Sequence, residues 1–402
     1  MGCCAASPPA AWSTEPVQDR RPSLLAALLV ALILLTAASP VSAAVPVVCG
    51  WPAWDQFKAH FLSDDGRVID ASTPRRHTVS EGQAYALFFA LVADDRASFE
   101  RILTWTENNL AQGDFTAHLP AWQWGRRDDG SWGVLDDNPA SDADLWIAYA
   151  LLEAGRLWKE RRYAVLSALI AKRILAEETA MLPGLGLTLL PGPNGFHPAP
   201  GLWRLNPSYV PLPLLRRLAD EDPEAGWGAL LTSSLQLITG AAPSGYAPDW
   251  VQYQAQRGFQ PDADTQAIGS YNAIRVYLWA GLMDAADPAR ARIVDTLRPM
   301  ARAVARSGDV PERVDTRNGS TQGAGPPGFR AAMRPFLVVA DEAAAVDSLA
   351  QRLTAQPVDA DAYYGQALSL FAQGRGKGPF RFAVDGRLLT QWNTECAATS
   401  AR

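Results

Sequence analysis

The chain has 402 residues, of which 48% are hydrophobic and 19% charged, a composition typical of globular proteins and not of disordered ones. A formal net charge of −6 argues against a nucleic-acid-binding surface, and four cysteines are too few for a disulfide-dense scaffold. The 14 tryptophans exceed what a packed core requires, and abundant flat rings often form platforms for a ligand.

The beginning of the chain predicts an export signal. No charged residue occurs between Arg21 and Asp55, and within this gap the stretch 24–38 is apolar and helix-prone. Small residues follow at 42–44, as at a signal-peptide cleavage site. We therefore expect cleavage near Ala44 and a periplasmic or secreted protein. An uncleaved membrane anchor is the alternative, since the apolar run is only slightly short for a membrane span.

Removal of a signal peptide at 1–44 leaves one domain at 45–402, because no stretch within it resembles an interdomain linker. Two cysteines remain, Cys49 and Cys396, one near each end. An oxidising compartment favours a disulfide between them, which would join the two ends of the domain. Two unpaired thiols are the alternative.

Apolar residues recur at helical spacing along the rest of the chain, and alternating strand patterns are scarce. The predicted helices lie at 51–62, 80–94, 97–110, 141–156, 161–178, 206–220, 224–239, 265–282, 288–307, 328–340, 341–354 and 361–373. The segment 380–389 is expected to form a small hairpin that turns at Asp385-Gly386. Loops rich in proline and glycine at 111–140, 181–205 and 240–264 are too long for simple connections, so we expect them to build a binding surface.

Twelve helices with no sheet predict an all-α fold, in which six helical hairpins close into a toroid, the (α/α)6 barrel. A helical solenoid is the competing architecture, but the sequence shows no repeat of fixed period. Alternate helices of such a barrel form its inner ring and point the same way. Polar residues at the starts of inner helices would therefore meet at one mouth.

Three of the predicted helices begin with polar groups suited to acid–base chemistry, and all three have even numbers in the chain order. Glu81 opens the second helix, Asp142 the fourth, and Asn272 and Arg275 lie near the start of the eighth. Each helix begins near a serine that could cap it, twice in a capping-box pattern. Acids at helix starts also merely favour the helix dipole, which is the simpler interpretation of any one of them.

The helix dipole lowers the pKa of a carboxyl group, whereas a general acid needs a raised pKa. Burial in a closed cleft and a neighbouring carboxylate would raise the pKa of Glu81. The predicted loops also carry aromatic rings that suit the apolar faces of sugars. We expect about half of these rings to touch ligand and the others to fill the core, as Trp146 and Trp158 do. The loop aromatics are Trp122, Trp124, Trp132, Trp203, Tyr209, Tyr246, Trp250, Tyr253 and Phe259.

The helix starts and loops described above belong to eight motifs, which are Ser80–Tyr85, Ala140–Trp158, Asn206–Tyr209, Ser270–Tyr277, Trp51–Trp54, Arg67–Asp70, Pro120–Gly125 and Asp361–Tyr364. Together these motifs resemble glycoside hydrolase family 8, and within it the periplasmic endoglucanases encoded with bacterial cellulose synthase. The resemblance covers nearly all of the predicted domain. It implies an (α/α)6 barrel and endo-hydrolysis of β-1,4-glucan with inversion at the anomeric carbon. It also implies a functional link to a cellulose synthase complex.

By this resemblance Glu81 is the general acid, and Asp142 holds the sugar at the cleavage subsite and stabilises positive charge there. Tyr271 and Arg275 would fix the catalytic water and the neighbouring carboxylate. The residues expected to bind substrate are Trp122, Trp124, Trp203, Tyr209, Tyr271, Arg275 and Tyr363. We expect a monomer that acts on a cellulose chain without metal or cofactor, and the four scattered histidines have no metal-ligand spacing.

Asn272 departs from the family pattern, which usually has an aspartate there as the general base. A neutral amide is far too weak a base, and loss of a general base typically costs about 10²–10⁴ in rate. Four explanations are open. The chain is a weak enzyme, or an enzyme whose base is Asp249, Asp262 or Asp264. Otherwise it is a glucan-binding relative that no longer hydrolyses, or the asparagine was introduced by substitution. Chitosan or xylan would be alternative substrates, although the loops lack the extra acids that a chitosan site should show.

Overall fold

The computed structural model describes residues 50–72 and 74–392. The predicted signal segment, its cleavage site and the proposed disulfide between Cys49 and Cys396 lie outside these residues. The boundary of the predicted domain at 45 lies outside them as well. Within the described part of the chain no helix is long and apolar enough to cross a membrane.

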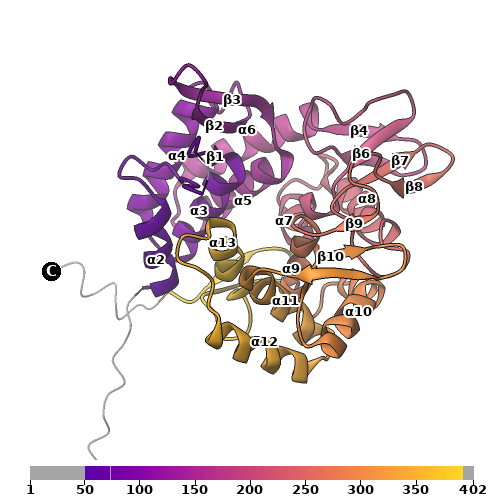
Figure 1. The fold of residues 1–402 in the computed structure, drawn as a ribbon. Helices are drawn as coiled ribbons and strands as arrows, with labels where there is room; N and C mark the ends of the chain where they lie inside the picture. Colours follow the sequence, from indigo (N-terminus) through magenta and orange to yellow (C-terminus); the bar gives the residue numbers. More distant parts are fainter. Residues whose placement is uncertain (1–49, 73, 393–402) are drawn as a thin grey trace, which may run out of the picture. The chain divides into compact units, whose positions relative to one another are not determined.

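Twelve α-helices are present in the described residues and alternate between two rings (Figure 1). The inner helices are α3 (Ser80–Val92), α5 (Ser141–Leu157), α7 (Leu212–Glu221), α9 (Ala273–Leu282), α11 (Pro327–Val339) and α13 (Tyr363–Ala372). The outer helices are α2 (Pro52–Phe61), α4 (Arg96–Leu110), α6 (Arg161–Glu177), α8 (Trp227–Gly240), α10 (Arg290–Ser307) and α12 (Ala343–Ala355). Each inner helix packs on an outer one, and α13 packs on α2 and closes the ring. The prediction of an (α/α)6 barrel is confirmed.

Burial is most complete in four of the inner helices, α3, α5, α9 and α11. All ten residues of α9 are buried, and twelve of the thirteen residues of α3 are buried, so these helices are covered on every side. Outer helices bury one stripe only: α4 buries seven of its fifteen residues and α12 only two of thirteen. This contrast is the expected consequence of apolar residues that surround the inner helices but recur on one face of the outer ones.

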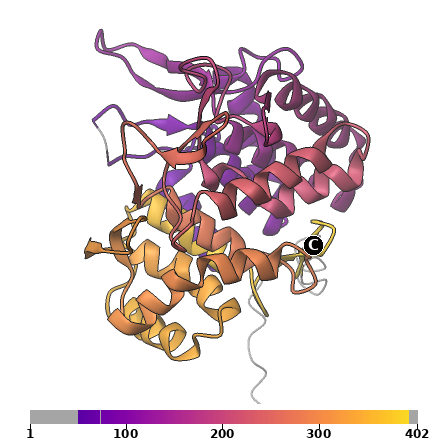
Figure 2. The same cartoon turned by 90° about the vertical axis from the view of Figure 1, so that its right-hand side faces the viewer.

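The structure corrects the prediction that the barrel has no sheet. The long segments predicted as loops fold into short antiparallel ribbons, which gather at the left-hand side of the view in Figure 2. The strands are β1 (Thr78–Val79), β2 (Ala121–Arg126), β3 (Trp132–Pro139), β4 (Thr179–Leu182), β5 (Gly186–Leu189), β6 (Leu202–Leu205), β7 (Val251–Gln254), β8 (Gly258–Pro261), β9 (Ile268–Gly269), β10 (Pro311–Asp315) and β11 (Thr321–Ala324). They form four small sheets, in the orders β1-β2-β3, β4-β5, β6-β7-β8 and β11-β10-β9.

Two predicted helices begin later than expected. The segment predicted at 206–220 opens with a 3₁₀ turn, η1 (Pro207–Tyr209), and α7 starts only at Leu212. The segment predicted at 265–282 is helical only from Ala273, because the residues before it form β9 and a tight turn. Prolines account for the first delay, since Pro211 stands in an extended conformation just before α7.

The predicted serine caps are absent. Val79 and Ala140 occupy the N-cap positions of α3 and α5, and neither has a side-chain capping bond. The Gln83 amide donates instead to the Gly66 carbonyl (3.1 Å) and accepts from Val68 N (2.6 Å). At α9, Ser270 Oγ donates to the carbonyl of Glu312 (2.7 Å), which leaves the capping of α9 to another residue.

The predicted C-terminal hairpin is confirmed as β12 (Phe380–Phe382) paired with β13 (Leu388–Thr390). Its turn needs a glycine, because Gly386 has a φ of 80°. The buried carboxylate of Glu153 holds the hairpin to the barrel. It accepts from Leu388 N (2.8 Å) and from Arg217 Nε (2.7 Å), and it also pairs with Arg156.

Removal of this carboxylate should destabilise the fold strongly. Glu153→Ala leaves the guanidinium of Arg217, which is only 3% exposed, without its buried partner. We expect a loss of about 3–5 kcal/mol in unfolding free energy, measured by urea denaturation. The matched control is Arg387→Ala, which removes two half-exposed ion pairs and should cost less than about 1 kcal/mol. Equal losses in the two variants would contradict this role for Glu153.

Candidate active site

The starts of α3, α5 and α9 meet around one buried arginine. Arg275, on α9, is 5% exposed. Its Nη1 donates to Asp142 Oδ2 (3.0 Å) on α5 and to the Tyr85 hydroxyl (2.9 Å) on α3. Its Nη2 donates to Asn272 Oδ1 (2.7 Å) and to Ser208 Oγ (3.0 Å). Three polar sites that are distant in sequence are therefore brought together, as their shared ring predicts.

Glu81 lies in the first turn of α3, beside this cluster. Burial, followed by the negative charge of Asp142, raises the pKa of Glu81 to about 7, although Arg275 and a hydrogen bond from the Trp122 side chain oppose the rise. One carboxyl oxygen, Oε2, is buried and has no partner among the described residues. A carboxyl group that is protonated near neutral pH and has an unused oxygen is suited to general acid catalysis.

Asp142 is 1% exposed, and each of its two carboxyl oxygens has a hydrogen-bond donor. Its Oδ1 accepts from Ala143 N (2.9 Å), and its Oδ2 pairs with Arg275. Burial raises the pKa of Asp142, and the charge of Arg275 acts against that rise. The two carboxyl groups therefore differ in surroundings: Glu81 has no cationic bonding partner, whereas Asp142 has one. This difference in surroundings favours Glu81 as the proton donor and Asp142 as the group that carries negative charge beside Arg275.

Asn272 has an amide group whose orientation is fixed. Its Oδ1 accepts from Arg275 Nη2 and also from Asn206 Nδ2 (3.2 Å). With the oxygen held by two donors, the part of the amide left for other partners is its NH₂ group, which only donates. The side chain can therefore donate a hydrogen bond to a water molecule, but it cannot take a proton from that water.

Three loop aspartates were predicted as alternative bases, and the structure separates them. Asp262 is buried in a two-bond ion pair with Arg204; burial alone would raise its pKa, but Arg204 and Thr265 lower it below the usual value. Asp264 has a side chain that is 77% exposed. Asp249 directly neighbours Asn272, since its Oδ1 accepts from Asn272 N (2.9 Å).

Asp249 is also the cap that the sequence did not reveal. The same Oδ1 accepts from the backbone nitrogens of Ser270 (2.8 Å) and Ala273 (2.7 Å). Burial raises the pKa of Asp249, and these backbone bonds counter the rise. Asp249 lies 24 residues before α9, so no local capping signal could have identified it.

The predicted aromatic residues fall into three groups. Trp122, at 37% exposure, bonds to Glu81, and Tyr209 has its ring 5.6 Å from the guanidinium of Arg275. Trp124 stacks on Trp132 at 5.4 Å on the β2–β3 ribbon. Tyr271 is 46% exposed next to α9.

Two of the aromatics predicted to bind substrate are buried. Trp203 is 7% exposed and stacks on His197 at 4.8 Å, and Tyr363 is 8% exposed and packs on Phe57. Their proposed contact with substrate stays a prediction. Trp146 and Trp158 fill the core, as expected.

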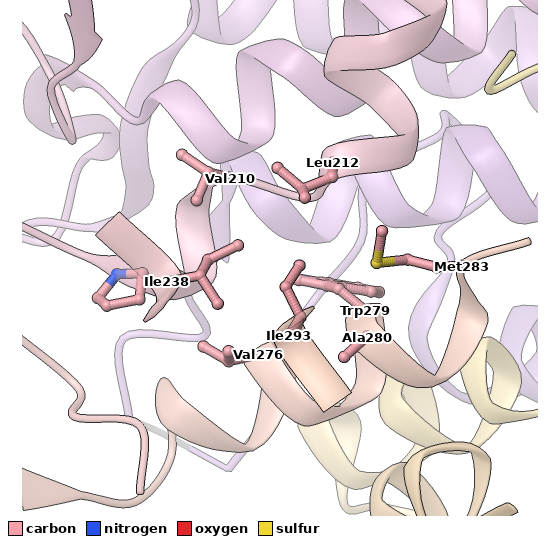
Figure 3. A pocket seen from close by; sticks show the side chains of 9 residues that line it. Val210, Leu212, Ile238, Val276, Trp279, Ala280, Met283 and Ile293 are labelled. Carbon is pink, nitrogen blue, oxygen red and sulfur yellow. The ribbon is translucent and has the colours of Figure 1, made fainter. Parts of the chain in front are cut away.

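Tyr85, Asn206 and Ser208 contact the site, although no role had been predicted for them. All three lie within motifs on which the family resemblance rests, Ser80–Tyr85 and Asn206–Tyr209, and this was the available signal. The pocket shown in Figure 3 lies between α7, α8 and α9 and is no competitor as a catalytic site. Its lining is apolar throughout, with Trp279, Met283 and Ile293 among the side chains that face one another. None of its lining residues can transfer a proton.

Comparisons with known proteins identify the family of this chain. The profile of the glycosyl hydrolases family 8 matches residues 25–378. An endoglucanase of Escherichia coli O157:H7 is 48% identical over 369 residues, which cover 92% of this chain and 97% of the relative. An endoglucanase of Xanthomonas axonopodis pv. citri is 45% identical over 386 residues, with 95% and 100% covered. The crystal structure of an endo-1,4-D-glucanase from Vibrio fischeri ES114 matches with a TM-score of 0.80 and 44% identity, over 85% of this chain and 99% of that one.

A toroid of helical hairpins that carries one carboxyl group with a raised pKa beside a second one paired with arginine is typical of a glycoside hydrolase. The chain belongs to glycoside hydrolase family 8. In the described residues no group of three or more histidine, cysteine, aspartate or glutamate side chains could hold a metal ion.

The raised pKa of Glu81 predicts how activity depends on pH. A general acid must be protonated, so the rate should fall as the pH rises through about 7. In Asp142→Asn the negative charge that helps to raise this pKa is gone, so the alkaline midpoint should move down by about 1 pH unit, whatever the remaining rate. Rates on carboxymethylcellulose from pH 4 to 9 measure the midpoint. The exposed variant Asp128→Asn is the control, and an unchanged midpoint in Asp142→Asn would contradict the assignment.

Proposed function

We propose that the chain is an endo-β-1,4-glucanase that hydrolyses cellulose-type chains with inversion. The observation that carries the proposal is the cluster around Arg275, in which Asp142 pairs with the arginine and its charge helps to raise the pKa of Glu81 to about 7. Relatives of 45–48% identity over more than nine-tenths of the chain are endoglucanases, which supports the same substrate class.

Each residue of the cluster then has a role. Glu81 protonates the glycosidic oxygen of the leaving sugar. Asp142, held by Arg275, hydrogen-bonds the sugar at the cleavage subsite and stabilises the positive charge that develops on its ring. Inversion means that water attacks directly from the opposite face of that ring, so no covalent intermediate forms on Asp142. Trp122 and Tyr209, beside the acid and the arginine, are placed to contact sugar rings.

The attacking water lacks an ordinary base, because position 272 holds an amide. Among the three loop aspartates, Asp249 is the one that bonds to the backbone of Asn272, so it is the remaining candidate for the proton acceptor. Its Oδ1 is already saturated by three backbone N–H groups, which leaves only its second oxygen. Such a base is poorly placed, and we propose an enzyme with reduced turnover.

Replacement of this amide tests the proposal directly. Asn272→Asp supplies a base without a change in side-chain size, and its carboxylate keeps the bond to Arg275. We expect kcat on soluble β-1,4-glucan to rise at least about tenfold, while KM changes little because the base acts on water and not on sugar. A reducing-sugar assay measures both constants.

Two further variants make the outcome unambiguous. Glu81→Gln in the Asn272→Asp background should abolish turnover. Asp249→Asn keeps an oxygen that can cap α9, so it should lower the residual rate only if Asp249 is the base. If Asn272→Asp gains nothing while the wild type is fully active, the base lies elsewhere. If both are inactive but bind cello-oligosaccharides, the chain is a glucan-binding protein.

Export and a role beside cellulose synthesis belong to the same proposal. The apolar run at 24–38 and the small residues at 42–44 that follow it support export. We also propose that the enzyme works as a monomer, since the ring of hairpins is closed by its own α13 and α2.

A further inference from the structure

A second pair of carboxyl groups lies behind the catalytic cluster. Asp144 is in the first turn of α5, two residues after Asp142, and Glu178 is the residue that ends α6. Both are 0% exposed. None of their four carboxyl oxygens has a donor among the described residues, apart from a hydrogen bond between the two side chains themselves. Two carboxylates can bond to each other only if a proton lies between them.

The charges around this pair offer no compensation for ionisation. The groups that act most strongly on it are all acids: Asp142, Glu81 and Glu177. The nearby arginines are engaged elsewhere, since Arg275 pairs with Asp142 and Arg173 with Glu177. Burial, followed by the charge of Asp144 and the hydrogen bond with it, raises the pKa of Glu178 well above its usual value. Burial does the same for Asp144, although the hydrogen bond with Glu178 opposes the rise.

The pair lies where backbone hydrogen bonds join three pieces of the chain. The first turn of α5 has no side-chain cap, and the Ser141 hydroxyl has no partner in the described structure. Ser141 N donates instead to the carbonyl of Pro191 (3.0 Å), and Leu190 N donates to the carbonyl of Glu178 (2.8 Å). The end of α6, the loop after β5 and the start of α5 are therefore linked in one place.

We infer that Asp144 and Glu178 share a proton and act as positioning residues, which hold the first turn of α5 so that Asp142 faces Arg275 and the sugar. The inference rests on the proposed function for its kinetic consequence, but not for the shared proton itself. The pair is no cation site, because no third ligand of the usual kinds lies with it in the described residues.

Two double variants test whether Asp144 and Glu178 position the first turn of α5 or only fill space in the core. Asp144→Asn with Glu178→Gln keeps a hydrogen bond between side chains of the same shape, and kcat at pH 6 should stay within about threefold of wild type. Asp144→Leu with Glu178→Met replaces the pair by apolar side chains of similar length, without any hydrogen bond. We expect this apolar variant to keep or raise its Tm, because buried polar groups replaced by apolar ones are often neutral or stabilising. Its kcat should nevertheless fall at least about tenfold.

The shared proton has a test that does not need hydrolysis. Folding takes up a proton wherever the pKa of a carboxyl group is raised in the folded state, so stability falls as the pH rises above the ordinary carboxyl range. The urea midpoint should therefore drop more steeply between pH 5 and pH 8 in the wild type than in the double amide variant. Parallel slopes would exclude a shared proton.

Measurement of ligand affinity as well as kcat distinguishes a failure of this inference from a failure of the proposed function. If no variant hydrolyses glucan, positioning is measured as the affinity for cellopentaose by calorimetry, in the Glu81→Gln background. A tenfold loss of affinity in the apolar variant but not in the amide variant supports the inference. Wild-type kcat or affinity in the apolar variant overturns it, because the pair would then serve only to fill the core.

Discussion

The guanidinium of Arg275 is the group on which the site depends. Each of the two terminal nitrogens of this buried arginine bonds two different partners, which come from α3, α5, the residue before α9 and the turn that holds Ser208, whereas its Nε has no partner among the described residues. Its charge is balanced by a single ionised partner, Asp142. An aspartate at position 272 would share that cation between two carboxylates. With Asn272 there, Asp142 is the one carboxylate that pairs with the arginine. Burial and the charge of Asp142 raise the pKa of Glu81, and the charge of Arg275 lowers it.

Much of the barrel could be predicted from the sequence because helical spacing is a local signal. The covered helices α3 and α5 began within a residue of the prediction, and their even numbers placed Glu81 and Asp142 in one ring. The ribbons were missed because their strands are short, and because some strand pairs, such as β6 with β7, lie far apart in the chain. Proline and glycine in those segments indicate irregular chain but do not exclude strands with a partner supplied from elsewhere.

The start of α9 shows where sequence reasoning about a site stops. Ser270 seemed the natural cap because it lies close to the helix, but the cap is Asp249, which comes from the segment before β7. A contact of this kind depends on the fold and not on spacing. The same holds for the pair of Asp144 with Glu178, since nothing in either local sequence distinguishes a buried acid from an exposed one. Burial, visible only in the structure, is what turns these carboxyl groups into proton carriers.

The bonds that hold residue 272 in place do not depend on whether that residue can act as a base. Asp249 holds the backbone of residue 272, and Arg275 and Asn206 hold its side-chain oxygen. Each of these bonds needs a backbone N–H or an acceptor oxygen, and neither requires a charge at position 272. An inverting hydrolase needs an acid and a base whose pKa values are pushed apart. Here Glu81 can act as the acid, whereas position 272 keeps its geometry but carries an amide in place of a basic carboxylate. A change from amide to carboxylate would therefore alter proton transfer without the rebuilding of any helix.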